Sequence, residues 1–286
     1  MHLVSRLERS VPPHAWFGVS AVFHYLGPSF AVLLFPSIGV LGVAWLRIAS
    51  AAAFFALIGR PLQAFRDADR SARWLMIGLG FCLAIMNSAF YLALDRLPMS
   101  LVAAVEFVGT IALALIGVRS WRNAAALLLA AIGVGLLIEV VWSDDPLGLF
   151  WAFLNGGLFV GYIALGHRLS RLGGPGAVDR LGAAMIIAFL AVLPVGIAQA
   201  MVAFSSPVLL GAAVGVGVCS SVIPYLCDQK AMARLPRASF ALLLALLPAL
   251  ATLIGAVVLS QIPSVRDGVG ILLVMAGVAL HKPAGR

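Results

Sequence analysis

Charged side chains are scarce in this chain of 286 residues. Asp, Glu, Lys and Arg together make up 10% of it, whereas soluble globular domains carry about 25% charge. Apolar residues make up 63%, and the mean hydropathy is +1.09. A chain with so few charges cannot cover a folded surface in water. The composition therefore excludes an ordinary soluble domain and indicates a protein that lies in lipid.

Cysteine is also rare, and the residues that usually build an enzyme site are missing. The three cysteines are Cys82, Cys219 and Cys227, all within apolar stretches, and their spacing matches no metal-binding pattern. There is no Walker-type glycine loop and no serine with a histidine in a credible position. We therefore expect no enzyme activity, no metal and no cofactor.

What the chain has instead is ten apolar stretches separated by short polar gaps. Most are 18 to 22 residues long, and a helix that rises 1.5 Å per residue needs about 20 residues to cross a bilayer core. The stretches are residues 15–35, 39–57, 74–94, 99–118, 124–141, 147–165, 181–202, 208–227, 240–259 and 265–281. The pattern predicts an all-α integral membrane protein with ten transmembrane helices.

Positive charge is concentrated in every second gap. Sixteen of the nineteen Lys and Arg residues lie there, namely Arg6, Arg9, Arg60, Arg66, Arg70, Arg73, Arg119, Arg122, Arg168, Arg171, Arg180, Lys230, Arg234, Arg237, Lys282 and Arg286. Only Arg96 and Arg266 lie in the other gaps, and Arg47 lies inside a stretch. By the positive-inside rule, this bias places both termini in the cytoplasm. One small basic cluster per loop favours contact with anionic lipid headgroups over nucleic acid as a partner.

A short internal repeat divides the chain into halves. Residues 93–98 (Ala-Leu-Asp-Arg-Leu-Pro) align with residues 231–236 (Ala-Met-Ala-Arg-Leu-Pro) at an offset of 138 residues, and the same offset places Thr110 opposite Pro248. Because each half has five spans, the second half enters the membrane from the opposite side. We predict two inverted five-helix repeats, 15–141 and 147–281, an arrangement typical of secondary transporters.

Four parts of the chain carry a family resemblance. They are residues 29–36 with Leu46-Arg47, residues 86–92, residues 97–98 continuing to the Glu-Phe-Val-Gly run 106–109, and residues 224–225 with 234–236 and 248–251. Together they resemble the drug/metabolite transporter superfamily of EamA type, most closely its bacterial threonine/homoserine exporters. The resemblance implies two EamA-like repeats, a multi-pass position in a bacterial inner membrane and export driven by protons.

Two charged residues lie deep within predicted spans. Glu106 is about eight residues into the fourth span, roughly 12 Å from the outer surface. A carboxylate there must pair, protonate or bind a cation. Arg47 is the opposite charge, in the second span. Each has a purely structural alternative: Glu106 could bond to a neighbouring helix, and Arg47 could form a fixed ion pair or a brace on backbone carbonyls. The resemblance favours Glu106 as the protonation site.

Uncharged polar side chains complete the candidate substrate and coupling site. Asn87 and Tyr91 are four residues apart and share one helix face, and Asn155 and Tyr162 lie on one stripe of the sixth span. These side chains could hydrogen-bond a small polar substrate, or they could hold helices together.

Prolines and small residues mark candidate hinges and cavity linings. A proline inside a helix has no N–H to donate and clashes with the carbonyl four residues earlier. The candidates are Pro28, Gly109, Thr110, Ser221, Pro224 and Pro248. His24, beside Pro28, could relay protons or simply pack.

These features predict a secondary transporter that exports small polar metabolites, with threonine and homoserine as expected substrates, by proton-coupled alternating access. The expected partners are the substrate, protons and the lipid bilayer, without nucleic acid. Two alternatives remain. An acidic site in an apolar cavity would also suit hydrophobic amines or drugs, and the chain could be a membrane scaffold that transports nothing. Glu106 and Arg47 within spans argue against a scaffold.

The charge bias makes a direct prediction about topology. Reporters fused after Arg66, Arg122 or Arg171 should lie in the cytoplasm, and reporters fused after Asp145 or Arg266 should lie outside, because only the first group follows basic gaps. A set of reporter fusions measures this. An external signal at Arg171 would contradict the five-plus-five inverted arrangement.

Overall fold

The computed structural model describes residues 11–115, 120–137, 145–172, 176–236, 239–240, 243–244, 246–262 and 264–280. Its α-helices are α2 (Pro13–Ile38), α3 (Val40–Ile58), α4 (Pro61–Asp67), α5 (Arg70–Leu94), α6 (Met99–Leu115), α7 (Trp121–Leu137), α8 (Pro146–Arg171), α9 (Ala177–Ala200), α10 (Pro207–Gly217), α11 (Ile223–Met232), α13 (Leu246–Leu259) and α14 (Val265–Leu280). A 3₁₀ turn, η1 (Met201–Ser205), follows α9, and a π-helical turn, η2 (Val218–Val222), joins α10 to α11. None of the described residues is in a strand, so the all-α prediction is confirmed.

Six helical segments are long and apolar enough to cross a membrane. They are α2, α3, α5, α8, α9 extended through η1, and the continuous run from α10 through η2 to α11. The described parts of α6, α7, α13 and α14 are shorter, at 14 to 17 residues. Each apolar stretch of the sequence overlaps one of these ten segments, although the number of crossings remains a prediction. The short helix α4 was not expected, because it lies in a polar gap.

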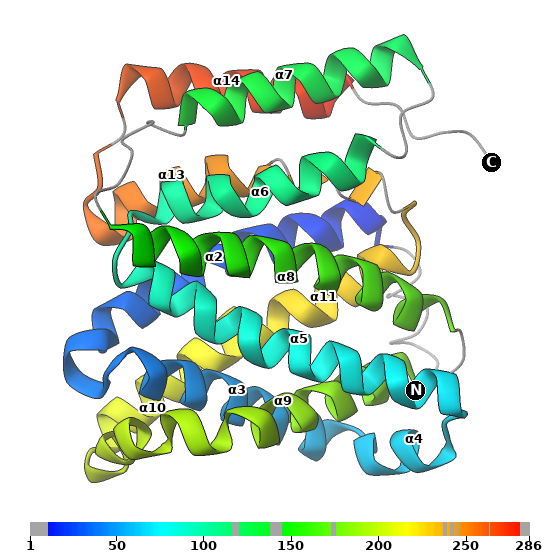
Figure 1. Ribbon diagram of the computed structural model, residues 1–286, viewed down its shortest axis with the longest axis vertical. Coiled ribbons are helices and arrows are strands. Elements are labelled where there is room, and N and C mark those ends of the chain that lie inside the picture. Colours follow the sequence, from blue (N-terminus) through cyan, green and yellow to red (C-terminus); the bar gives the residue numbers. More distant parts are fainter. Residues whose placement is uncertain are drawn as a thin grey trace.

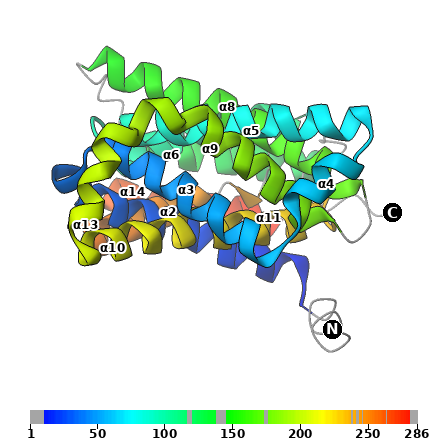
Figure 2. The ribbon, with the colours of Figure 1, turned by 90° about the horizontal axis from the view of Figure 1, so that it is seen from below.

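The helices run side by side across the view in Figure 1, roughly at right angles to the long axis of the molecule. Helix α7 packs on α14, α3 on α9, α5 on α8, and α11 on α2. Figure 2 shows that α5 and α8 lie on one side of the bundle and α10 on the other. Helix α2 packs on α3 from its own half of the chain and on η2, α11 and α13 from the other half, so side chains of both halves meet along it.

One end of the bundle gathers the basic segments. Arg234 donates from Nη1 to the carbonyl of Val11 (2.7 Å), and Arg122 donates from Nε to the carbonyl of Leu280 (2.7 Å). The beginning of α2, the end of α14 and α4 thus lie at the same end (Figure 1). This is the arrangement that the positive-inside pattern needs if that end faces the cytoplasm.

The opposite end is held by an ion pair between two turns. Arg96 donates from Nη1 to Asp145 (2.8 Å), and Asp145 also accepts from the backbone N–H of Gly148 (2.9 Å), which caps α8. The Gly148 N–H, with Arg96 beside it, keeps the pKa of the Asp145 carboxyl below its usual value of 3.8. The carboxylate is therefore charged throughout the physiological range, as both the cap and the ion pair require.

Large apolar side chains cover the outside of the bundle and polar ones lie within it. Leu33, Phe81 and Phe153 are more than half exposed, whereas Arg47 and Glu106 are each 3% exposed. Such an arrangement is costly in water, because the apolar surface meets solvent and the charges do not. In a bilayer the apolar surface contacts lipid tails, and the interior polar groups satisfy one another.

Two glycines let α2 and α3 approach the π-helical turn closely. A Cβ atom at Gly27 of α2 would lie 2.7 Å from the backbone N of Ser220 and 2.8 Å from its Cα. A Cβ at Gly217 would lie 2.9 Å from the carbonyl oxygen of Arg47. All three distances are shorter than a Cβ atom tolerates, so only glycine allows these backbones to meet.

This packing yields a prediction with a matched control in the same helix. Gly27→Ala should destabilise the protein by about 1–3 kcal/mol, because the new methyl group meets backbone that cannot move freely. Gly18, also in α2, has open space around it. Gly18→Ala should therefore be neutral or should stabilise by about 0.5–1 kcal/mol. Thermal unfolding of the purified protein in detergent measures both, and equal unfolding temperatures would contradict the packing described.

Candidate functional site

The site begins with a carbonyl that a proline leaves without its usual helical donor. Pro224 has no N–H, so it cannot donate to the carbonyl of Ser220, four residues earlier. The guanidinium of Arg47 takes that place: Nη2 donates to the Ser220 carbonyl (2.8 Å), and Nε donates to Oγ of Ser221 (2.8 Å). Of the structural alternatives for Arg47, the structure shows the brace on a backbone carbonyl.

Hydrogen-bonding groups remain unused around Arg47. Cζ of Arg47 lies 5.1 Å from the centroid of the Tyr91 ring, which is a cation–π contact. Nη1 of Arg47, the hydroxyl of Tyr91 and Oγ of Ser220 are buried and have no hydrogen-bond partner among the described residues. Buried polar groups are nearly always paired, so these three unpaired groups make the surroundings of Arg47 a candidate binding site.

Glu106 lies in α6 and accepts from two other helices. The hydroxyl of Tyr25 in α2 donates to Oε2 (2.9 Å), and Nδ2 of Asn155 in α8 donates to Oε1 (3.2 Å). Both donors are neutral, and no ion pair joins Glu106 to Arg47 among the described residues. The carboxylate is thus held in place without a fixed countercharge.

Asp228 in α11 is a second buried carboxylate, which we did not expect from the sequence. It is 2% exposed and accepts from the hydroxyls of Ser20 in α2 and Tyr162 in α8, the latter at 2.7 Å. The apolar stretch predicted for this region ends at Cys227, so Asp228 counted as part of a polar gap. The sequence feature that could have identified Asp228 is its spacing. It lies four residues after Pro224, and residues four apart share one face of a helix.

The remaining polar residues link the two halves of the chain. The hydroxyl of Tyr225 in α11 donates to Oδ1 of Asn87 in α5 (2.9 Å). Nδ2 of Asn87 donates to the carbonyl of Leu83 in its own helix (2.6 Å), so the bond from Tyr225 is the one that joins α5 to α11. His24 packs edge-on against Tyr25 and Phe159, with ring centroids 5.3 and 5.5 Å away.

The candidate hinge residues fall into three groups. Pro28 lies inside α2, and Ser221 and Pro224 lie at the junction of η2 with α11, close to the Gly27 contact. Pro248 lies in α13, which is described from Leu246.

Two further hinge candidates, Gly109 and Thr110, belong to α6. The structure describes neither the surroundings of Gly109 nor the side chain of Thr110. Their roles, like those of the other hinge candidates, stay predictions.

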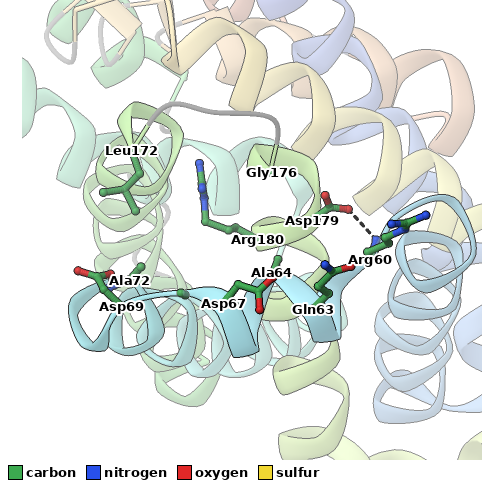
Figure 3. Close-up of a pocket in the computed structure, with 11 residues that line it drawn as sticks. Arg60, Gln63, Ala64, Asp67, Asp69, Ala72, Leu172, Gly176, Asp179 and Arg180 are labelled. Atoms are coloured by element: carbon green, nitrogen blue, oxygen red, sulfur yellow. Dashed lines mark hydrogen bonds between the residues drawn. The ribbon is translucent and has the colours of Figure 1, made fainter.

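A pocket of about 600 Å³ lies elsewhere, between α4 and the ends of α5, α8 and α9 (Figure 3). Its charged groups include Asp69, Asp179 and Arg60. Asp179 accepts from the backbone N–H of Arg60 (2.7 Å), and Asp69 caps α5 through the N–H of Ala72 (2.9 Å). These carboxylates hold the loops at the basic end of the bundle, and no predicted site residue lines the pocket.

Known proteins resemble this chain over most of its length. The EamA-like transporter family model matches residues 146–281. The threonine/homoserine exporter RhtA of Salmonella typhimurium (strain LT2) is 30% identical over 256 residues, which cover 88% of this chain and 84% of the relative. RhtA of Escherichia coli (strain K12) is 31% identical over 238 residues, 82% of this chain and 79% of the relative.

One solved crystal structure shares the fold. It has a TM-score of 0.67 and 18% sequence identity, and the match covers 93% of this chain and 96% of the other. Similarity of this extent, together with the sequence matches, confirms the resemblance stated from the motifs. The chain is a transmembrane protein of the EamA-like transporter family, within the drug/metabolite transporter superfamily.

Proposed function

We propose that this protein exports small zwitterionic amino acids, threonine and homoserine above all, from the cytoplasm by proton-coupled alternating access. The observation that carries the proposal is the pair of opposite charges buried at the centre of the bundle. Arg47 has an unused donor among the described residues, and Glu106 has no cationic partner there. An amino acid brings one group of each sign.

The substrate's carboxylate fits the group around Arg47. Nη1 of Arg47 and the hydroxyls of Tyr91 and Ser220 are donors, and a guanidinium with a spare N–H binds carboxylates strongly. The ammonium group fits Glu106, which accepts from neutral donors only. Returning a proton to Glu106 from outside would discharge it, release the ammonium and reset the site.

The relatives support the choice of substrate. The RhtA proteins of Salmonella typhimurium and Escherichia coli are exporters of threonine and homoserine. A hydrophobic amine or drug would use the carboxylate but would leave the donors around Arg47 unpaired, so the structure favours a zwitterion. We also place the protein in a bacterial inner membrane with both termini in the cytoplasm, as a transporter rather than an enzyme.

The proposal includes ten crossings arranged as two inverted repeats, 15–141 and 147–281. Asn87 and Tyr225, which bond directly, are 138 residues apart, the offset of the internal repeat. Equivalent residues of two repeats are expected to contact each other where they lie on the symmetry axis that relates the repeats. The same offset carries α3 onto α9 and α7 onto α14, and each of these pairs packs together. The match of the family to residues 146–281 coincides with the second repeat.

Two tyrosines provide a matched test of substrate binding. Tyr91 and Tyr225 are both fully buried, but only the Tyr225 hydroxyl has a partner among the described residues. Tyr91→Phe keeps the ring on Arg47, so it should leave the unfolding temperature unchanged and raise KM for threonine about 3- to 10-fold. Tyr225→Phe should instead cost about 1 kcal/mol of stability. Wild-type KM in Tyr91→Phe would argue against a carboxylate site here.

The coupling role of Glu106 is tested with Glu106→Gln. Glutamine keeps the shape and accepts the Tyr25 hydrogen bond, but it cannot gain or lose a proton. In inverted membrane vesicles, the variant should insert normally and lose threonine uptake driven by a pH gradient. It should retain exchange of threonine for threonine, because exchange needs no net proton movement. Glu106→Asp should keep part of the gradient-driven activity, with a shifted pH optimum.

A purely structural carboxylate has a different signature. Glu106→Gln would then keep gradient-driven uptake, and any loss would follow lower protein levels in the membrane. Wild-type dependence on the gradient in Glu106→Gln would end the coupling proposal.

A further inference from the structure

Glu106 and Asp228 both accept hydrogen bonds from α2 and α8, at two different levels along the length of these helices. On α2, Tyr25 binds Glu106 and Ser20 binds Asp228; on α8, Asn155 binds Glu106 and Tyr162 binds Asp228. The α2 donors are five residues apart and the α8 donors seven, which separates the carboxylates by about 8–10 Å along the bundle. α2 begins at the basic end and α8 ends there, so Asp228 is the level nearer that end.

Asp228 also lies close to that end on its own helix. It precedes the last residue of α11, Met232, by four residues, or about 6 Å. Just beyond, Arg234 bonds to Val11 at the beginning of α2. A modest separation of α11 from α2 at this end would therefore bring Asp228 into contact with cytoplasmic water.

Neither carboxylate has a cationic partner in the described part of the chain. Asp228 is faced by Ser20 from α2 and by Tyr162 from α8, and its charge acts on two titratable groups of its own helix, Tyr225 and Cys227. Arg47, the one buried arginine or lysine among the described residues, bonds to serines of η2 instead. An isolated ionised carboxylate inside a membrane bundle costs several kcal/mol. Each of the two must therefore bind a proton or a cation during the cycle.

A row of aromatic rings separates the two levels. It runs from Tyr25 to His24 (5.3 Å between centroids), from His24 to Phe159 (5.5 Å) and from Phe159 to Tyr162 (5.8 Å). The end members are the hydroxyl donors to Glu106 and Asp228. The row therefore links the hydroxyl partner of one carboxylate to that of the other, in the position expected of a closed barrier in an alternating-access transporter.

We propose that Asp228 is a second proton-binding site of the transport cycle, which exchanges its proton with the cytoplasm while Glu106 exchanges with the outer side. This inference rests on the proposed function. A proton from outer water forms an O–H bond on Glu106. When the rings part, that bond breaks, and water carries the proton to the carboxylate of Asp228. The O–H bond on Asp228 then breaks in turn as cytoplasmic water accepts the proton, so that one proton enters and one leaves.

The test uses the full-length protein in proteoliposomes with two readouts, threonine transport driven by a pH gradient and threonine exchange at equal pH. Asp228→Asn should lower gradient-driven transport about tenfold or more and keep exchange close to the wild-type rate. Asp228→Glu should restore part of the driven transport. Asp95→Asn, at an exposed turn of the outer end, is the matched control and should behave as wild type.

The outcomes separate this inference from the proposed function. Full gradient dependence in Asp228→Asn, with loss in Glu106→Gln, would overturn the role of Asp228 and leave the exporter intact. Loss of exchange as well, in protein with a normal unfolding temperature, would also overturn it, because Asp228 would then serve substrate binding. If wild type moves no threonine, the proposed function itself fails.

A second variant keeps the test decisive where Asp228→Asn does not fold. Ser20→Ala retains the carboxylate and removes one of its two donors. It should shift the pH profile of gradient-driven transport without changing exchange. An unshifted profile would count against the second proton site.

Discussion

The hydrogen bonds from Arg47 to the π-helical turn are the interaction on which the centre of this protein depends. In a bilayer no water is available to bond interior polar groups, so each needs a partner within the protein. Arg47 reaches from α3 to the carbonyl of Ser220 and to Oγ of Ser221, both at 2.8 Å. These bonds hold a positive charge in the apolar bundle, and Nη1 of the guanidinium is still unpaired among the described residues.

Close packing around the π-helical turn makes this brace possible. Gly27 and Gly217 bring α2 and α3 against η2 at distances that no side chain would permit. π-Helical turns are rare and often occur at functional sites, where they redirect backbone groups. Here the turn sits between α10 and α11, in the run that also carries Asp228. Movement of this run would change the Arg47 contacts and the surroundings of Asp228 together.

The sequence was a good guide to the helices and a partial guide to the site. Long apolar runs locate the helical segments of the bundle other than α4, because apolar length is what the bilayer selects. Glu106 and Arg47 stand out for the opposite reason, since charge is costly inside a span. Asp228 did not stand out in the sequence, because it follows directly after an apolar run, near Lys230, and resembles a loop residue.

Partners across the bundle could not be read from sequence spacing. Tyr25 was not expected to bind Glu106, because a tyrosine in an apolar helix looks like a packing residue until the opposing helix is placed. Asn87 was expected to meet either the substrate or a neighbouring helix; the structure shows a bond to Tyr225 of α11, and contact with the substrate stays a prediction. The helix α4 was missed because seven residues within a polar gap have no apolar run to mark them.

The most direct measurement is a cryo-EM structure of the protein with threonine bound. We expect the carboxylate of threonine within about 3 Å of Nη1 of Arg47, close to the hydroxyls of Tyr91 and Ser220, and its ammonium group directed toward Glu106. Threonine bound in the pocket beside α4, with Arg47 and Glu106 keeping the contacts described above, would contradict a transport site at the centre of the bundle.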